Sequence, residues 1–308
     1  MKENCEIWTA LVWCIEIMVV GGFLIVVLLV WEPQNPVASL LFIPATMVHP
    51  LFYETLLLNF ANEGFAVIGL HPAGHGKSPR DGKRYTVGDI IQNGSDAITF
   101  ALEHFAVPVI VMGSSQGGIA AAALASADKR ISAVFSHNIM LSELPGSIAI
   151  TRFPLWLRHV YRPMQAVFRF FAWLLPDLEL PLSFYLDKTR ISTEASVWDA
   201  VERDPLCLKK YPLHFLSSLF TTRFPGLTDG SVHCPVYVVA DSGDKLFTAA
   251  YIRQVFEHLR APYKEMVLFH FNDHMLMVTH PGEVCAALSI KMKKLLHAGT
   301  EKGSTRTI

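Results

Sequence analysis

A turn rich in glycine and serine is the first feature of the sequence that could do chemistry. Residues 113–117 are Gly-Ser-Ser-Gln-Gly and fit the pattern G-x-S-x-G. The apolar stretch VPVIVM precedes the turn, and the Ala-rich stretch GIAAAALA follows it. A sharp turn from strand to helix lifts the hydroxyl of the central serine above a sheet and aims a helix N-terminus at a developing oxyanion. The pattern predicts Ser115 as a nucleophile and Ser114 as a structural residue.

A serine nucleophile requires a base, and the base requires an acid that orients it. Candidates in the chain order serine, acid, histidine follow two later apolar stretches. Asp241 and Asp244 come after PVYVVA, and His274 ends the segment Asn-Asp-His at 272–274. The carboxyl ends of parallel strands meet at one edge of a sheet, so these side chains are expected to converge on Ser115. The pattern alone leaves Asp241 and Asp244 as alternative acids.

Short apolar runs alternate with helical patterns through most of the chain. Strands are expected at 37–43, 65–70, 108–112, 131–135, 236–240 and 265–269. Helices are expected at 52–61, 87–105, 119–127, 248–260 and 282–296. This alternation predicts an α/β fold with a mostly parallel central sheet flanked by helices on both faces. Between about 138 and 230 the alternation stops, and prolines and aromatic residues become frequent.

Four segments resemble the α/β-hydrolase superfamily, in particular the branch of monoacylglycerol lipases, lysophospholipases and serine aminopeptidases. They are HPAGHGKS at 71–78, the turn at 113–117, PVYVVADSGD at 235–244, and NDH at 272–274 followed by His280-Pro281. The likeness extends from about residue 37 to 296, without the middle segment. It implies Ser115, Asp244 and His274 as the catalytic triad, and leaves His75 to stabilise its own loop.

The resemblance also implies how the chain is divided. The α/β-hydrolase core would comprise residues 37–137 and 231–296, and residues 138–230 would form an inserted, mainly helical cap. Residues 297–308 are polar and are expected to be a disordered tail.

Two backbone N–H groups are expected to form an oxyanion hole. One belongs to Gln116, directly after the nucleophile, and the resemblance places the other in the loop after the first core strand. The His-Gly usual in that loop of the family is replaced here by Pro44-Ala45. By position Thr46 supplies the second N–H, with Met47 as the alternative donor.

The predicted cap contains a basic and aromatic segment. Residues 150–176 hold four arginines, seven aromatic residues and no acidic residue. Beyond Pro163 one face of a predicted helix would carry Met164, Phe168, Phe171 and Leu175. Such a helix suits a membrane surface or the mouth of a lipid-binding cleft. It equally suits the packing of a cap onto its core.

A long apolar segment precedes the predicted core. Residues 7–31 include one charged residue, Glu16, and carry Trp8, Trp13 and Trp31 toward their ends. About 20 apolar residues in a helix cross a hydrocarbon core of ~30 Å, and tryptophans are typical of the ends of such spans. We expect an uncleaved single-pass transmembrane helix rather than a signal peptide, whose apolar part would be shorter. The positions of the cations favour an external catalytic domain.

Composition limits the classes of partner. The chain has 308 residues, of which 51% are hydrophobic and 17% charged, and its net charge is −1. This charge gives no strong field toward nucleic acid. The five cysteines lack metal-binding spacing and there is no dinucleotide-binding motif, so we expect neither a metal nor a cofactor.

The leading functional hypothesis is a serine hydrolase that cleaves small-molecule carboxylic esters with an apolar acyl chain. Monoacylglycerols and lysophospholipids are the substrates that the resemblance implies. A peptidase or amidase, or an acyltransferase that uses an alcohol in place of water, is the alternative on the same triad. A membrane-tethered binding protein without activity is disfavoured, because all three members of the predicted triad are present.

Overall fold

A central eight-stranded sheet organises the protein, whose computed structural model describes residues 13–21, 24–80 and 84–304. The strand order is β1-β2-β4-β3-β5-β6-β9-β10. The strands are β1 (Trp13–Gly21), β2 (Leu24–Glu32), β3 (Ala38–Ile43), β4 (Phe65–His71), β5 (Val109–Ser114), β6 (Ile131–His137), β9 (Val236–Asp241) and β10 (Lys264–Phe269). From β4 to β10 every pair of neighbours is parallel. The predicted α/β-hydrolase fold is thereby confirmed, and β5, β9 and β10 end at the same edge.

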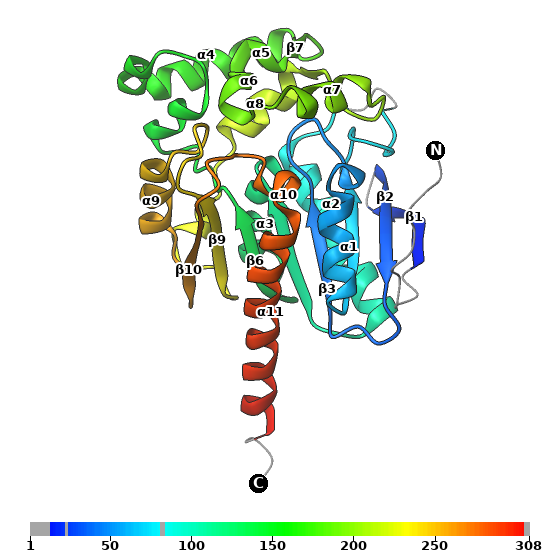
Figure 1. Cartoon of the computed structure of the whole chain (residues 1–308). Helices are drawn as coiled ribbons and strands as arrows, with labels where there is room; N and C mark the ends of the chain where they lie inside the picture. Colours follow the sequence, from blue (N-terminus) through cyan, green and yellow to red (C-terminus); the bar gives the residue numbers. More distant parts are fainter. Residues whose placement is uncertain (1–12, 22–23, 81–83, 305–308) are drawn as a thin grey trace.

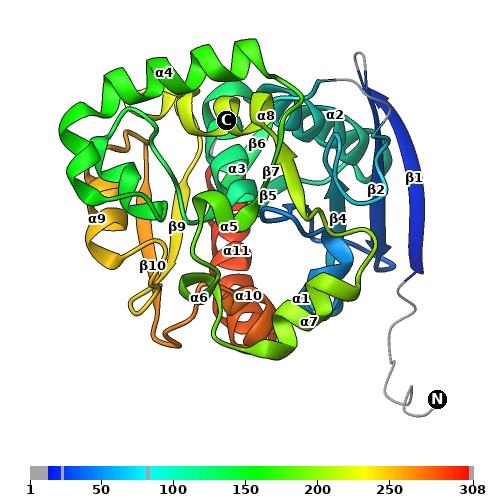
Figure 2. The same ribbon diagram turned by 90° about the horizontal axis from the view of Figure 1, so that it is seen from above.

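Helices cover both faces of the sheet. The core helices are η1 (Pro50–Tyr53), α1 (Glu54–Asn62), α2 (Val87–Phe105), α3 (Gln116–Ala127), α9 (Ala249–His258), α10 (Leu276–Thr279) and α11 (Pro281–Ser304). α1 packs against α11 on one face, and α2 packs against α3 on the other (Figure 2). The sheet between them is shielded from water on both sides, which explains why its strands are apolar at nearly every position.

Helix α11 is longer than the sequence indicated. We expected residues 297–308 to be disordered, but α11 continues to Ser304. Residues 298–304 contain no proline, so a helix that has already formed can continue through them. The expectation of disorder is therefore wrong for 297–304, and residues 305–308 lie outside the described chain.

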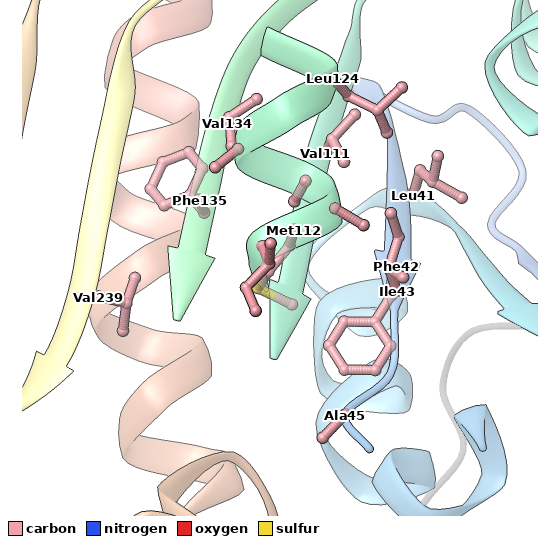
Figure 3. Packing of buried hydrophobic residues seen from close by; sticks show 14 of the residues in the cluster. Leu41, Phe42, Ile43, Ala45, Val111, Met112, Leu124, Val134, Phe135 and Val239 are labelled. Atoms are coloured by element: carbon pink, nitrogen blue, oxygen red, sulfur yellow. The ribbon is translucent and has the colours of Figure 1, made fainter. Parts of the chain in front are cut away.

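The hydrophobic core lies where β3, β5 and β6 meet α3. Phe42, Met112, Val134 and Leu124 come from these four elements and lie within one cluster (Figure 3). All four side chains are fully buried. Since β5 and α3 flank the glycine–serine turn, this core fixes the position from which Ser115 projects.

Residues 13–21 and 24–32 form two antiparallel strands at the edge of the sheet, where we expected a transmembrane helix over 7–31. β1 pairs antiparallel with β2, and β2 pairs antiparallel with β4 (Figure 1). Residues 26–31 are all buried. A strand buried on both faces is apolar at every position, so its sequence resembles that of a buried or membrane-spanning helix.

The transmembrane expectation is therefore wrong for residues 13–31, and residues 7–12 lie outside the described chain. Within the described ranges, none of the helices combines the length and the hydropathy needed to cross a bilayer.

Between β6 and β9 the chain leaves the sheet and builds a separate layer of short elements. They are η2 (Pro145–Ile150), η3 (Leu155–Val160), α4 (Tyr161–Leu174), β7 (Glu179–Pro181), α5 (Leu182–Tyr185), α6 (Lys188–Ile191), α7 (Ala195–Arg203), β8 (Lys210–Pro212), α8 (Leu213–Thr221) and η4 (Pro225–Leu227). β7 pairs with β8, and α4 packs against α8. Most of this layer gathers at one end of the sheet (Figure 1). We refer to residues 138–230 as the cap.

Candidate active site

The chain turns sharply where β5 meets α3, and Ser115 occupies this turn. Its backbone has φ 51° and ψ −112°, a conformation that residues other than glycine rarely adopt. A Cβ added at Gly113 would lie 2.0 Å from the Gly117 carbonyl oxygen. One added at Gly117 would lie 2.0 Å from the Ile43 carbonyl oxygen. Close backbone contacts therefore require both glycines and explain the spacing of the motif.

Ser115 faces a cavity beneath the cap. Its backbone N–H donates to the His137 carbonyl oxygen at 2.8 Å, which ties the turn to the end of β6. The residue is 8% exposed and lines a pocket together with His274 and the cap residue Trp198. The structure thus brings the predicted nucleophile and base to one cavity, although no hydrogen bond joins their side chains in this conformation of the described chain.

Asp244, the acid predicted to orient His274, is hydrogen-bonded to it. His274 Nδ1 and Asp244 Oδ2 are 2.8 Å apart, and both residues are buried. The other oxygen, Oδ1, accepts the backbone N–H groups of Leu246 and Phe247 at 2.7 and 2.9 Å. Burial alone would raise the pKa of Asp244, but the interaction with His274 and these hydrogen bonds outweigh it and hold the pKa at about 2. The acid is therefore ionised at neutral pH.

Asp241, the alternative acid, has a structural position instead. Its carboxylate accepts backbone N–H groups from Gly243 at 2.8 Å, Phe271 at 2.6 Å and Asn272 at 2.9 Å. These bonds join the loop after β9, which carries Asp244, to the loop after β10, which carries His274. Asp241 therefore holds the two loops in register.

The two predicted oxyanion donors lie beside Ser115. Gln116 is the first residue of α3, so its N–H has no acceptor within the helix. Thr46 lines a pocket with Ser115 and Gln116. The N–H of Met47, the alternative donor, points elsewhere and donates to Tyr211 Oη at 2.7 Å. Among the described residues, the Thr46 N–H has no such acceptor.

Tyr211 connects the cap to the loop after β3, which carries the predicted oxyanion donor Thr46 and which we call the oxyanion loop. Its hydroxyl also lies 2.9 Å from His75 Nε2, and His75 Nδ1 lies 2.8 Å from the Ala73 carbonyl oxygen. Burial lowers the pKa of His75 to about 4, so this imidazole is neutral at pH 7. It donates from Nδ1 and accepts the Tyr211 proton at Nε2. Leu208 adds a second link, since its N–H donates to the Met47 carbonyl oxygen at 2.8 Å.

Sequence analysis missed a polar pair behind Asp244. Asn138 Nδ2 donates to Asp244 Oδ2 at 3.0 Å and lies 3.0 Å from His137 Nε2. Both His137 and Asn138 are fully buried. No known motif contains them, and the one available signal was the presence of two polar residues at the carboxyl end of a central strand.

Two groups of described side chains bring potential metal ligands within 4.8 Å of one another: His137, Asp244 and His274, and His49, Asp204 and Cys207. In each group the carboxylate already bonds a histidine, and His49 Nε2 lies 2.7 Å from Asp204 Oδ2. Burial raises the pKa of Cys207 to about 12, so this thiol is protonated at neutral pH in the structure as it stands. Hydrogen bonds within the protein thus account for both carboxylates.

An apolar cavity of about 340 Å³ lies within the cap. It is lined chiefly by α4, α5 and α8, and by Phe153 and Leu157. Tyr185 and Phe220 line both this cavity and the pocket that contains Ser115. The cap therefore places a large apolar space next to the nucleophile.

Comparison with known proteins identifies the family of the chain. The family model "Serine aminopeptidase, S33" matches residues 34–280. The chain belongs to this family. It is a serine hydrolase of the α/β-hydrolase superfamily, as the sequence motifs implied. No curated protein sequence matches the chain.

Several solved structures share the fold of this hydrolase. A monoacylglycerol lipase from Paleococcus ferrophilus is 19% identical, with a TM-score of 0.68 over 85% of this chain and 96% of that one. A soluble variant of the Saccharomyces cerevisiae monoglyceride lipase is 14% identical, with a TM-score of 0.71 over 91% and 94%. A thermostable carboxyl esterase from Bacillus coagulans is 15% identical, with a TM-score of 0.74 over 92% and 99%.

Proposed function

We propose that this hydrolase cleaves carboxylic esters with apolar acyl chains through Ser115, His274 and Asp244. One observation carries the proposal above all: Ser115, on its strained turn, shares a cavity with His274, and His274 is hydrogen-bonded to buried Asp244. The coincidence of nucleophile, base and acid at one edge of the sheet is the arrangement that serine acyl transfer requires.

In the proposed reaction, Ser115 Oγ attacks the ester carbonyl carbon while His274 Nε2 accepts its proton. The N–H groups of Gln116 and Thr46 donate to the oxyanion that forms on the carbonyl oxygen. Collapse of this intermediate breaks the carbon–oxygen bond, and His274 returns the proton to the leaving alcohol. A water molecule then attacks the acyl-enzyme at the same carbonyl carbon, with His274 again accepting the proton. The carboxylic acid product leaves, and His274 returns the proton to Ser115 Oγ.

The apolar cavity supports a lipid-like acyl group. Its lining carries almost no polar surface, so it would bury methylene groups, each of which contributes ~0.8 kcal/mol when removed from water. Tyr185 and Phe220 line both this space and the pocket with Ser115, so the two spaces adjoin at these side chains. Monoacylglycerols and lysophospholipids are esters that combine such a chain with a polar alcohol.

The substrate class is tested by measuring kcat/KM for p-nitrophenyl esters with acyl chains of 2 to about 16 carbons. We expect the value to rise with chain length until the cavity is filled. Met164→Trp, which fills the cavity from α4, should move the optimum to shorter chains. Ala166→Trp is the matched control, because Ala166 lies on the exposed side of the same helix.

A different result would redirect the proposal. Preference for acetyl esters in both the wild type and Met164→Trp would contradict an acyl-binding role for the cavity. Faster turnover of amino-acid p-nitroanilides than of any ester would identify a peptidase on the same triad.

A further inference from the structure

The turn that ends β6 contacts both the predicted nucleophile and the predicted acid. The His137 carbonyl oxygen accepts the Ser115 N–H at 2.8 Å. The side chain of the next residue, Asn138, donates to Asp244 Oδ2 at 3.0 Å. The backbone of His137 therefore contacts the predicted nucleophile, and the side chain of the next residue, Asn138, contacts the predicted acid.

The backbone of Asn138 does not explain why this residue is an asparagine. Its φ is 66°, in the left-handed region, and the residue is fully buried. Asparagine adopts this conformation more readily than most residues, but glycine adopts it most readily of all. Glycine would serve the turn alone, so the amide side chain has a separate use.

The surroundings fix the orientation of the amide. Asn138 Nδ2 lies 3.0 Å from Asp244 Oδ2, 3.0 Å from His137 Nε2 and 3.4 Å from His274 Nδ1. The reversed amide would set its oxygen against the Asp244 carboxylate, which would bring two acceptors together. His274 Nδ1 donates its own proton to Asp244, so the two amide protons belong to Asp244 and His137.

His137 is the second acceptor for the amide. Since its Nε2 accepts from Asn138, its proton is on Nδ1, which lies 3.2 Å from Ser114 Oγ. Burial lowers the pKa of His137 to about 3, and the nearby His274 lowers it further than the Asp244 charge raises it. His137 is therefore neutral over the working range of a hydrolase and remains an acceptor.

We propose that Asn138 is a positioning residue that holds the Asp244 carboxylate toward His274, with His137 fixing the Asn138 amide from behind. The proposal rests on the triad proposed above. With Asn138, Asp244 receives four N–H donors, the others being His274, Leu246 and Phe247. Four donors satisfy both oxygens of a carboxylate, limit its basicity and prevent its rotation.

The first test is Asn138→Gly, which keeps the left-handed backbone and removes only the amide. We expect kcat to fall about 10- to 100-fold with KM unchanged, as for loss of a hydrogen bond to a charged group. The acidic limb of the kcat/KM profile should move to higher pH, because a more basic Asp244 stabilises protonated His274. Among the described residues, Asp244 and His137 lie against His274, and the pocket that contains its ring is also lined by the charged or ionisable side chains of Arg190, Glu194, Lys245, Asp273 and His280, which both proteins share.

Ala106→Gly is the matched control. Ala106 also has a left-handed backbone, with φ 50°, at the end of α2 and outside the site. Its replacement should leave kcat and the pH profile unchanged. Thermal unfolding and the final extent of labelling by a fluorophosphonate verify that each variant is folded.

A second variant, Asn138→Asp, tests the same claim if the glycine variant does not fold. It keeps the shape of the side chain but sets a carboxylate oxygen against Asp244. We expect a larger loss of kcat at neutral pH and partial recovery as the pH falls and a proton is shared.

The outcomes separate this inference from the proposed function. Wild-type kcat and an unshifted pH profile in folded Asn138→Gly or Asn138→Asp would overturn the positioning role. A wild-type protein without esterase turnover and without fluorophosphonate labelling would instead overturn the proposed triad itself.

Discussion

At the scale of single residues, the site separates two aspartates that the sequence could not distinguish by spacing. Asp241 ends β9 and Asp244 lies in the loop that follows, yet Asp241 accepts three backbone N–H groups while Asp244 bonds His274. The motif could predict where the carboxylates lie along the sheet. It could not predict which of them faces the histidine, because that depends on contacts with the loop after β10.

Asp244→Asn and Asp241→Asn should therefore have different effects. We expect Asp244→Asn to lower kcat about 10³- to 10⁴-fold in a folded protein, because the amide cannot orient or stabilise His274. Asp241→Asn should cost about 1–3 kcal/mol of unfolding free energy with a much smaller loss of kcat, since its N–H partners belong to the backbone. Steady-state kinetics and urea unfolding measure both, and the opposite pattern would assign the acid to Asp241.

His137 and Asn138 show why part of the site was beyond sequence analysis. The triad belongs to a motif with fixed order and context, and the fold confirms that context around Ser115. The pair behind Asp244 belongs to none of the motifs identified in the sequence. It contacts the site only because β6 lies between β5 and β9 in the sheet. A long-range contact of this kind leaves no periodic signal in the sequence.

Among the elements, β8 of the cap contacts the oxyanion loop, which follows β3, through the side chain of Tyr211. Tyr211 accepts the Met47 N–H and bonds His75, so one hydroxyl joins the cap, the oxyanion loop and the loop after β4. Because Thr46 precedes Met47 directly, the position of the predicted oxyanion donor depends on this hydroxyl.

Tyr211→Phe should lower kcat about tenfold while KM changes little, because the oxyanion forms only in the transition state. It should also cost about 1–3 kcal/mol of stability, since the buried Met47 N–H loses its acceptor. Tyr237→Phe, on β9 and outside the site, is the control. Equal kcat values for the wild type and Tyr211→Phe would show that the cap does not position the loop.

The first two strands are the elements that sequence analysis misassigned. Helices with caps were located well: Val87–Phe105 matches the expected span, and Thr86 caps it with the side chain of Asp89. The segment before Glu32 has no alternation of polar and apolar residues, because β2 lies between β1 and β4 under a helix layer. Uniform hydrophobicity cannot separate a buried strand from a membrane helix.

Trp31→Ala distinguishes these two structures experimentally. Trp31 is 1% exposed and lies under Gly69, where an added Cβ would come within 3.1 Å of its ring. Its removal from a packed core should cost about 3–5 kcal/mol of unfolding free energy. Urea denaturation of the detergent-free protein measures this. A tryptophan in an anchor outside the folded domain would leave the unfolding free energy unchanged.

At the scale of the whole molecule, the cap presents an apolar interior to the site and an apolar exterior to its surroundings. Met164, Phe168 and Phe171 of α4 line the cavity, but Phe171 is also exposed to solvent, and Leu175, the fourth residue of the predicted face, is exposed and not part of the lining. On the outer side Phe170 is 55% exposed and Trp173 is 75% exposed. The cavity lining agrees with the packing interpretation for Met164 and Phe168, and contact with a membrane stays a prediction.

Association with lipid surfaces would follow from the exposed face. We expect Phe170→Ser with Trp173→Ser to weaken binding to vesicles of phosphatidylcholine and phosphatidylserine and to slow hydrolysis of esters held in them. Hydrolysis of soluble esters should be unchanged. Ile290→Ser, an equally exposed apolar position on α11, is the control. Equal vesicle sedimentation for all three proteins would contradict a surface-binding cap.

The central claim is that Ser115 is a nucleophile activated by His274. The most direct measurement is the mass of peptides from the protein after reaction with a fluorophosphonate, with Ser115→Ala and His274→Ala treated in parallel. We expect one adduct on Ser115, absent from Ser115→Ala and formed at least about 100-fold more slowly in His274→Ala. An adduct on Ser114 or another residue, or a folded wild-type protein that remains unmodified, would contradict it.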